Sequence, residues 1–160
     1  MRHHTRPGDA VKHHFENHDL VTERGSQLVD VTDELHAAVE RADVTNGMAL
    51  VYSPHTTCAI VINEHESGFI DDFNQLLEEL APESGRYYRH DDLDIRTEGL
   101  DDADLHPNGW SHTRAGLLSS SSQSVPIVDG NLMLGRWQRV FFCELDRSRP
   151  RKIFFQVIGE

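Results

Sequence analysis

Histidine is the side chain in this sequence best suited to chemistry near neutral pH, because its ring gains and loses a proton in that range. The segment His106-Pro-Asn-Gly-Trp-Ser-His112 holds two such rings beside a turn signal. Loops can display polar groups that a hydrophobic core cannot. This segment therefore predicts a polar site, supported by the β-like stretches that follow it. The alternative is that the C-terminal third is simply the β half of a core.

Three histidines stand beside the ends of predicted elements: His55 between two strands, His90 after two tyrosines, and His112 at the start of a helix. Neutral imidazole binds zinc and similar metals, and charged imidazole binds phosphate. Three protein ligands with an open fourth position form the usual catalytic zinc site. The sequence lacks an HExxH pattern, so this cluster requires the fold to bring the three rings together. Three unrelated histidines are the alternative.

Carboxylates and amides near the predicted strand and helix ends could complete such a site. Asn63-Glu64 and Asp71-Asp72 could orient a ligand imidazole or hold Mg²⁺. The two aspartates could equally be helix-start charges, which the helix dipole favours. Zinc and magnesium are therefore the candidate cofactors.

Two residues of the C-terminal strands have both a structural and a functional interpretation. Trp137 could stack on a ligand ring or pack in the core. Glu144 lies in an apolar strand, where a carboxylate needs a partner. Arg149 or Arg151 could supply it through a bidentate pair, and a structural ion pair competes with a catalytic role for this glutamate.

The charge composition excludes one class of partner. Asp and Glu total 27 against 15 Lys and Arg, giving a formal net charge of -12. Nucleic acid is not an expected partner, since phosphate backbones need a basic surface. Only Lys12 and Lys152 are lysines, and an acidic, lysine-poor surface indicates adaptation to high salt, that is, a halophilic protein.

The hydrophobic pattern predicts one soluble domain. No apolar run is long enough to span a membrane, and the N-terminus has no signal-peptide core, so we expect a cytoplasmic protein. Cys58 and Cys143 lie in apolar strands and are expected to be buried thiols. Residues 1–12 are expected to form a mobile arm, and residues 13–160 a single domain.

Short β-branched and aromatic runs alternate with amphipathic stretches along the chain. The predicted strands are 15–23 and 27–31, joined as a hairpin, then 48–52, 58–62, 124–130 with a turn at 129–131, 132–138 leading into 140–144, and 152–158. The predicted helices are 32–44, with Thr32 as N-cap, 67–82 and 113–118.

Several of these motifs together resemble one known family. They are His55-Thr-Thr-Cys-Ala-Ile-Val-Ile-Asn-Glu64, Asp71-Asp72, Tyr88-Arg-His90, Asn108 with His112, Gly135-Arg-Trp-Gln138, and Glu144. In this order they resemble the YjbQ family, also called UPF0047 or the secondary thiamine-phosphate synthase family. The resemblance covers the chain from about residue 15 to the end. Ser119 departs from it, because the family usually has a glycine there.

The resemblance implies an α+β fold with two packed, mostly antiparallel β-sheets and flanking helices, assembled as a homotrimer. It also implies weak thiamine-phosphate synthase activity, which joins hydroxymethylpyrimidine diphosphate to a thiazole phosphate. The implied catalytic residues are His55, His90, His112 and Glu144, and the three histidines are also the implied metal or phosphate ligands. The implied substrate-binding residues are Thr57, Asn63, Asp71, Asn108, Trp137 and Gln138. A metal- or anion-binding protein and a metal-assisted hydrolase are the alternatives.

Overall fold

The computed structural model describes residues 10–101 and 105–160. Most of the predicted N-terminal arm, residues 1–9, lies outside the described residues, and Lys12 already belongs to a strand. The elements follow in chain order: β1 (Lys12–Val21), β2 (Gln27–Asp30), α1 (Thr32–Ala42), β3 (Gly47–Tyr52), β4 (Cys58–Glu64), α2 (Ser67–Leu80), the 3₁₀ helix η1 (Arg89–Asp91), α3 (Gly109–Leu118), β5 (Ser122–Val128), β6 (Asn131–Leu132), β7 (Gln138–Glu144) and β8 (Pro150–Gly159).

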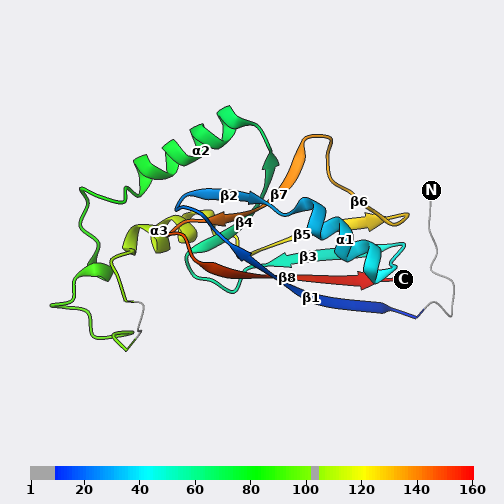
Figure 1. The fold of residues 1–160 in the computed structure, drawn as a ribbon, viewed down its shortest axis with the longest axis horizontal. Coiled ribbons are helices and arrows are strands. Elements are labelled where there is room, and N and C mark those ends of the chain that lie inside the picture. The colour runs from blue at the N-terminus through cyan, green and yellow to red at the C-terminus, as the bar shows by residue number, and fades with distance from the viewer. Residues whose placement is uncertain (1–9, 102–104) are drawn as a thin grey trace.

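Two antiparallel sheets carry the fold, as predicted (Figure 1). The larger sheet has the strand order β1-β8-β3-β5-β6, and the smaller one has the order β2-β7-β4. The chain switches sheets repeatedly, so that consecutive strands such as β3 and β4 lie in different sheets. The fold is α+β, with helices beside the two sheets.

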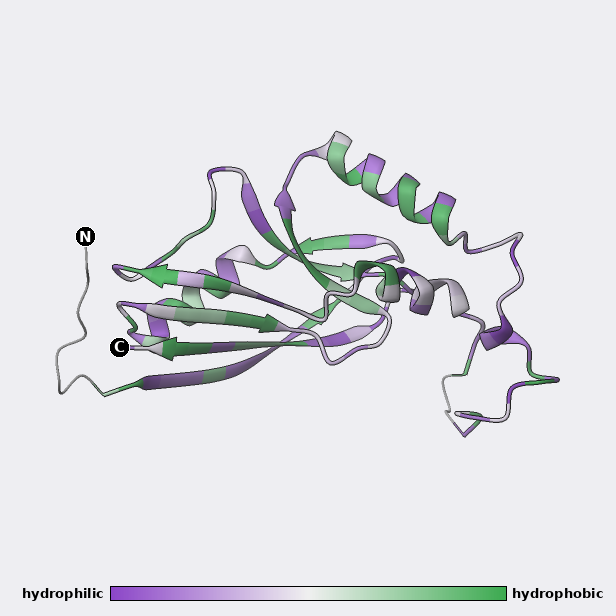
Figure 2. Ribbon diagram, turned by 180° about the vertical axis from the view of Figure 1, so that it is seen from behind, coloured by the Kyte–Doolittle hydropathy of each residue, from purple (hydrophilic) through white to green (hydrophobic). Residues whose placement is uncertain are grey.

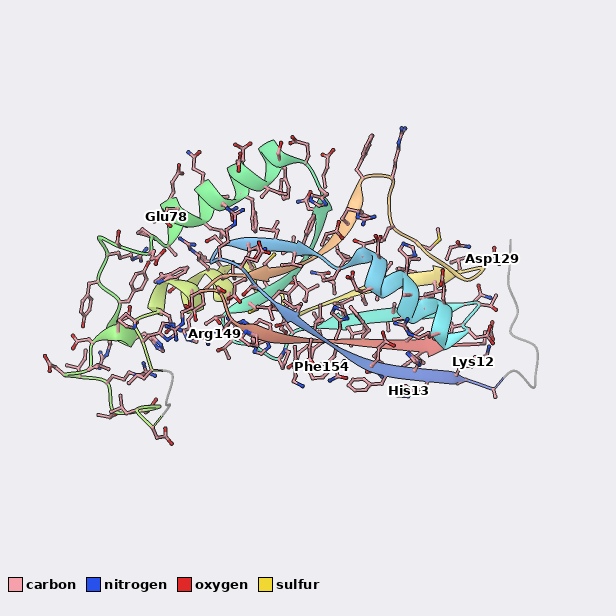
Figure 3. The ribbon with its side chains drawn as sticks, in the orientation of Figure 1. Lys12, His13, Glu78, Asp129, Arg149 and Phe154 are labelled. Atoms are coloured by element: carbon pink, nitrogen blue, oxygen red, sulfur yellow. The ribbon has the colours of Figure 1, made fainter. Side chains whose placement is uncertain are left out.

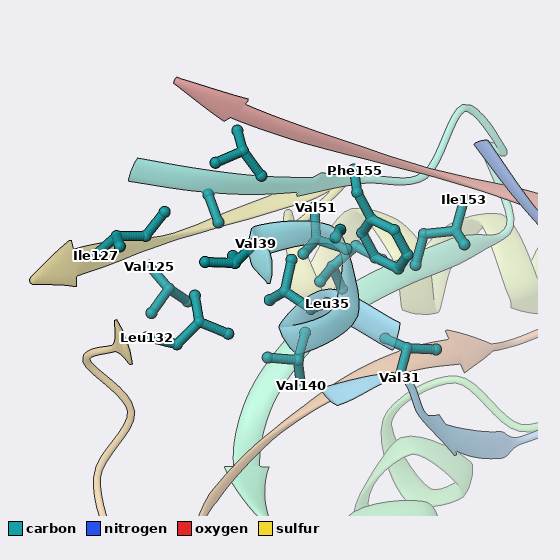
Figure 4. Close-up of a cluster of buried hydrophobic side chains, with 14 of the residues drawn as sticks. Val31, Leu35, Val39, Val51, Val125, Ile127, Leu132, Val140, Ile153 and Phe155 are labelled. Carbon is teal, nitrogen blue, oxygen red and sulfur yellow. The ribbon is translucent and has the colours of Figure 1, made fainter. Parts of the chain in front are cut away.

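The main core lies between α1 and the inner faces of the two sheets. Figure 4 shows Leu35 and Val39 of α1 among side chains of β3, β5, β7 and β8. A second cluster, which includes Phe141 and Cys143, lies on the other face of β7, next to α2 and α3. The smaller sheet is therefore buried on both faces, which explains why β7 reads as a continuous apolar run rather than an alternating one.

The predicted hairpin between the first two strands is wrong. β1 pairs with β8, whereas β2 pairs with β7 in the other sheet. The connection between them packs tightly: a Cβ on Gly25 would lie 2.2 Å from the carbonyl oxygen of Asp146. Thr22 also ends β1 by donating its backbone N–H to Arg149 O at 3.2 Å. These long-range contacts decide the pairing, and the local sequence does not contain them.

Some predicted helix ends differ from the structure. Val31, not Thr32, is the N-cap of α1, because Asp30 Oδ1 accepts hydrogen bonds from the Thr32 N–H and hydroxyl. The third helix begins four residues earlier than predicted, at Gly109, so His112 lies inside it.

The outer face of the larger sheet is uncovered in the single chain. Figure 2 shows β1 as a mainly hydrophilic strand, but Phe15 on it stacks on Phe154 of β8 at 5.6 Å between ring centroids. Both cysteines are buried and free, as predicted. Among the described residues, no helix is long and apolar enough to cross a membrane.

Candidate functional site

A cavity of about 550 Å³ lies where the β3–β4 connection, the start of β8 and the start of α3 meet. Its lining is dominated by histidine and arginine. The residues that line it are Pro54, His55, Thr56, Thr57, His90, Arg96, Gly99, Asp101, Leu105, His106, Asn108, His112, Arg149 and Arg151. The structure thus brings the three predicted histidines, together with Thr57 and Asn108, to one cavity.

His55 is held against β8. Its Nε2 lies 2.9 Å from the backbone nitrogen of Lys152, which has only a proton to donate. Nε2 therefore accepts, and the proton of the neutral ring is on Nδ1. Burial lowers the pKa of His55 below its ordinary value of 6.5, and the charge of Arg151 lowers it further, so the ring favours its neutral form.

The start of α3 places the other two predicted histidines. Asp91 Oδ1 accepts from the backbone nitrogens of Asn108 and Gly109 at 2.9 and 2.8 Å, which ties η1 to the helix. A Cβ on Gly109 would lie 2.6 Å from the Cβ of Tyr88, so only glycine permits this approach. As a result the ring centroids of His90 and His112 lie 4.5 Å apart.

His112 is half-buried on the first turns of α3, four residues after Asn108 and thus on the same helix face. Burial lowers its pKa below 6.5, and the neighbouring His90 lowers it further. His90 in turn lies 3.1 Å from Asn108 Oδ1, measured from its Nε2. These contacts form a compact polar group on one wall of the cavity.

Arg114 fixes α3 itself, although its side chain is fully buried. Its guanidinium donates to Ala81 O at 2.9 Å and to Ser26 Oγ at 2.7 Å, and it forms an ion pair with Glu78. It also lies over the ring of Trp110, 4.6 Å from the centroid. One side chain therefore joins α3 to α2 and to the connection before β2, which positions the helix that carries His112.

Glu144 lies beneath the cavity rather than in it. It is completely buried, and both of its oxygens accept from Arg151 at 2.6 Å, which confirms the predicted bidentate pair. Thr22 Oγ1 donates to the same carboxylate at 3.1 Å. Although burial opposes it, the bonds to Glu144 raise the pKa of Arg151 above its ordinary value. Burial raises the pKa of the adjacent Cys58 to about 12, so that this thiol stays protonated.

Several lining residues were not predicted as site residues. Arg96 donates from Nε to Glu98 O at 2.8 Å and from Nη1 to His90 O at 3.1 Å. His106 Nε2 lies 3.1 Å from both oxygens of the buried Asp146. The His106–His112 segment was a signal for this histidine, whereas no local pattern distinguishes the arginine from others on the surface.

Four predicted substrate-binding residues do not line this cavity. Gln138 and Asn63 lie at the other end of the β4–β7 pair, where Asn63 is opposite Arg139. From Cys58 to this end, β4 covers about 20 Å at roughly 3.3 Å per residue. Trp137 is 61% exposed in the turn before β7, and Asp71 is exposed on α2. Within one chain the predicted set is thus divided between two places.

The described side chains do not fit a three-histidine metal site. In residues 10–101 and 105–160, no group of three His, Cys, Asp or Glu side chains is arranged to hold a metal ion. The hydrogen bond from Lys152 also occupies Nε2 of His55. The donor set, three arginines and four histidines, suits an anion instead.

Comparisons with known proteins agree with this architecture. The family described as UPF0047 protein YjbQ-like matches residues 16–160. UPF0047 proteins of Archaeoglobus fulgidus and Methanothermobacter thermautotrophicus are each 38% identical, over 139 and 141 residues; the first match covers 87% of this chain and 97% of the relative, the second 88% and 89%.

A solved structure shares the fold. The crystal structure of a YbjQ-like protein of unknown function from Sulfolobus solfataricus superposes with a TM-score of 0.81 at 33% identity, covering 94% of this chain and 100% of that one. Sequence and fold agree over nearly the whole chain. The protein therefore belongs to the YjbQ-like UPF0047 family.

Proposed function

We propose that the cavity binds a phosphorylated small molecule. The observation that carries this is the state of Arg151. Its Nε and Nη2 are fixed by Glu144, and Nη2 also donates to Thr57 Oγ1 at 3.1 Å. Its Nη1 makes no hydrogen bond to the described residues, and the side chain lines the cavity. A guanidinium held in place from behind, with donors left over, is a preorganised phosphate ligand.

The local charge supports an anionic ligand despite the overall charge of -12. Arg96, Arg149 and Arg151 line the cavity with four histidines and one acidic residue, Asp101. The carboxylates that pair with Arg149 and Arg151, Asp146 and Glu144, lie outside the lining. A phosphate gains charge-assisted hydrogen bonds in such a place, because guanidinium groups present several donors with fixed geometry. An anionic ligand would therefore bind in this cavity rather than elsewhere on the acidic surface.

The reaction we propose is transfer of the thiamine-phosphate synthase type, as the family resemblance implies. The thiazole nitrogen would form a bond to the methylene carbon of the pyrimidine, and the bond from that carbon to diphosphate oxygen would break. The departing diphosphate carries the electron pair, so cationic donors that bind it lower the barrier. In this proposal His55, His90 and His112 bind phosphate oxygens, Thr57 and Asn108 position the ligand, and Glu144 holds Arg151.

The test combines binding with turnover. Inorganic diphosphate binding is measured by calorimetry, and thiamine phosphate formation is assayed from the two substrates with and without divalent metal. Arg96→Gln removes a cavity charge and should weaken diphosphate binding roughly tenfold or more, since a charge-assisted bond contributes about 1.5–3 kcal/mol. Arg41→Gln, an exposed α1 arginine paired with Glu16, makes the same charge change elsewhere and should leave binding unchanged.

Each outcome separates the candidate functions. No diphosphate binding by the unchanged protein would reject the anion site itself. Binding without product, under both metal conditions, would reject the transferase and leave an anion-binding protein. Phosphate release only with added divalent metal would support the metal-assisted hydrolase instead.

We also propose that the chain forms a homotrimer through the outer face of the larger sheet. Around Phe15 and Phe154 its outward positions lack Asp, Glu, Lys and Arg. They are His13, Phe15, Asn17, Met48, Leu50, Tyr52, Ser124, Pro126, Val128, Phe154, Gln156 and Ile158. Farther along β1 and β8 the same face carries one pair of opposite charges, Asp19 with Lys152 at 3.4 Å. Figure 3 shows Phe154 and His13 on the side of β8 and β1 that faces away from α1. A largely apolar face with no excess of negative charge lets strongly acidic copies associate without bringing like charges together.

Light scattering tests this assembly. We expect a mass about three times 18.2 kDa, and a lower mass for Phe154→Glu, which puts a charge in the aromatic stack with Phe15 and Tyr52. Leu76→Glu, at an exposed apolar site on α2, is the matched control and should keep the assembly. A single-chain mass for the unchanged protein in both low and molar salt would reject the trimer.

Salt adaptation is tested in the same samples. Molar KCl shortens the Debye length to about 3 Å, from about 30 Å at 0.01 M, and so screens the surface acids. The melting temperature should therefore rise with salt. An unchanged melting temperature would mean that the acidic surface is tolerated rather than adapted.

A further inference from the structure

A chain of hydrogen bonds links two cavity histidines through a residue outside the cavity lining. His90 Nε2 lies 3.1 Å from Asn108 Oδ1, and Asn108 Nδ2 lies 3.4 Å from Asp146 Oδ2. On the other side, His106 Nε2 lies 3.1 Å from each oxygen of Asp146. Asp146 is 3% exposed and lies on the connection between β7 and β8. Asp146 is therefore the shared hydrogen-bond partner of His106 and Asn108.

The chemistry of Asp146 sets the direction of every bond in this chain. An ionised carboxylate can only accept, and Arg149 Nη2 lies 3.6 Å from Oδ2 as its counter-charge. The groups that face it must therefore donate. His106 carries a proton on Nε2, and Asn108 turns its NH₂ group toward the carboxylate.

The orientation of the Asn108 amide then decides the proton position on His90. With its NH₂ directed to Asp146, the amide presents Oδ1 to His90 Nε2. An amide oxygen only accepts, so Nε2 of His90 must carry the proton. Arg96 Nη1 is 3.4 Å from the same ring nitrogen, but it donates to the His90 carbonyl at 3.1 Å and does not require a lone pair on Nε2.

We infer that Asp146 is a positioning residue that sets the tautomers of two cavity histidines, His106 directly and His90 through Asn108. The consequence for His90 is specific. In the neutral ring, Nδ1 carries no proton, so it can bind a phosphate by accepting a hydrogen bond from a protonated phosphate oxygen. His55 has the opposite tautomer, because the backbone N–H of Lys152 donates to its Nε2. This assignment stands whatever ligand the cavity binds.

Nitrogen NMR tests the assignment without any activity assay. In ¹⁵N-labelled protein at about pH 8, where ordinary imidazoles are neutral, long-range ¹⁵N–¹H correlations distinguish the protonated ring nitrogen from the bare one. We expect Nε2–H in His90 and His106, and Nδ1–H in His55. His65 is an internal control with Nδ1–H, since its Nδ1 lies 2.9 Å from Asp30 Oδ2. A bare Nε2 in His90 or His106 of the unchanged protein would overturn the inference.

Two substitutions show whether Asp146 is the cause. Asp146→Ala removes both carboxylate oxygens, so neither His106 nor the Asn108 amide keeps the acceptor that fixes it. At least one of His90 and His106 should lose its Nε2–H signature, while His65 keeps its own. Retention of both signatures would show that Asp146 does not set them.

Asn108→Ala breaks the hydrogen bonds that connect Asp146 to His90, and it keeps the test decisive if Asp146→Ala fails to fold. It should change the tautomer of His90 only and leave His106 unchanged. The helix start should survive, because Asp91 binds the backbone nitrogens of residues 108 and 109 and the Asn108 side chain makes no cap hydrogen bond. An unchanged His90 signature in this variant would reject the relay through Asn108.

Discussion

The two ends of the β4–β7 strand pair carry the same kind of ion pair in different surroundings. At the cavity end Arg151 is paired with Glu144, and their side chains are 4% and 0% exposed. At the other end Arg139 is paired with Asp33, with exposures of 37% and 84%. Both ends pair an arginine with carboxylates, but Arg151 binds both oxygens of Glu144, whereas Arg139 divides its donors between Asp30 and Asp33. Burial and bidentate geometry together therefore distinguish the pair that holds the structure from the surface contact.

The buried end behaves as a connected unit. Arg151 is bonded to Glu144 and Thr57, and Glu144 also accepts from Thr22 and from the backbone nitrogen of Asp146. Removing one member leaves the others buried without their partner, which costs more than the pair contributes. Three predictions test this contrast between the ends, and a fourth concerns the turn that ends α3.

The largest effect is expected from Glu144→Ala. It leaves the Arg151 guanidinium buried without its carboxylate, which should lower the free energy of unfolding by about 3–5 kcal/mol. Asp33→Ala breaks the matched pair at the exposed end and should cost less than about 1 kcal/mol. Urea denaturation measures both. Similar losses for the two variants would show that burial does not distinguish these pairs.

The pH dependence of stability should separate the same two regions. The pKa values of His55 and His112 are lowered in the folded protein, so between that pKa and 6.5 the unfolded chain binds more protons. The contribution of these two histidines to the free energy of unfolding is full above pH 6.5 and is lost as the pH falls through the folded pKa. Asp30 belongs to the other end, and its lowered pKa places the corresponding loss below pH 3.8.

Urea denaturation at a series of pH values measures the loss of stability in both pH ranges. A His55→Gln, His112→Gln double variant should flatten the decline that begins at pH 6.5 and keep the acid limb. Asp30→Asn should do the reverse. A decline below pH 6.5 that persists unchanged without the two histidines would assign it to other groups.

A smaller, stabilising effect is expected from Ser119→Gly. Ser119 ends α3 with φ of 48°, a left-handed conformation that favours glycine. The substitution should raise the free energy of unfolding by about 0.5–1 kcal/mol. Ser121→Gly, two residues along and without a positive φ, is the control and should not stabilise. A loss of stability in Ser119→Gly would mean that its side chain has a role in the turn.

The smallest effect is expected from Trp137→Ala at the exposed end. The indole is 61% exposed, and its described ring contact is with Arg136, whose guanidinium carbon lies 4.7 Å from the ring centroid. The free energy of unfolding should change by about 0.5 kcal/mol or less. A larger loss that depends on protein concentration would show that this turn contacts another copy.

The sequence alone determined the elements whose pattern is long and local. The amphipathic stretch after Ser67 predicted α2, and the apolar run at 140–144 predicted β7. The need of the buried Glu144 for a cationic partner predicted a pair with Arg149 or Arg151, and the structure has Arg151. Each of these predictions depends on hydrophobic periodicity or on the cost of burying a charge, and both can be read from the local sequence.

Only the tertiary structure decided which residues share a cavity. His55, His90 and His112 come together because α3 is held by Arg114 and Asp91, contacts between residues far apart in sequence. The same folding separates Asn63 and the other far-end residues from them. The order of motifs along a chain does not predict which of them are close in space. A strand places its two ends far apart, whereas a helix followed by a turn can bring the chain back to the same place.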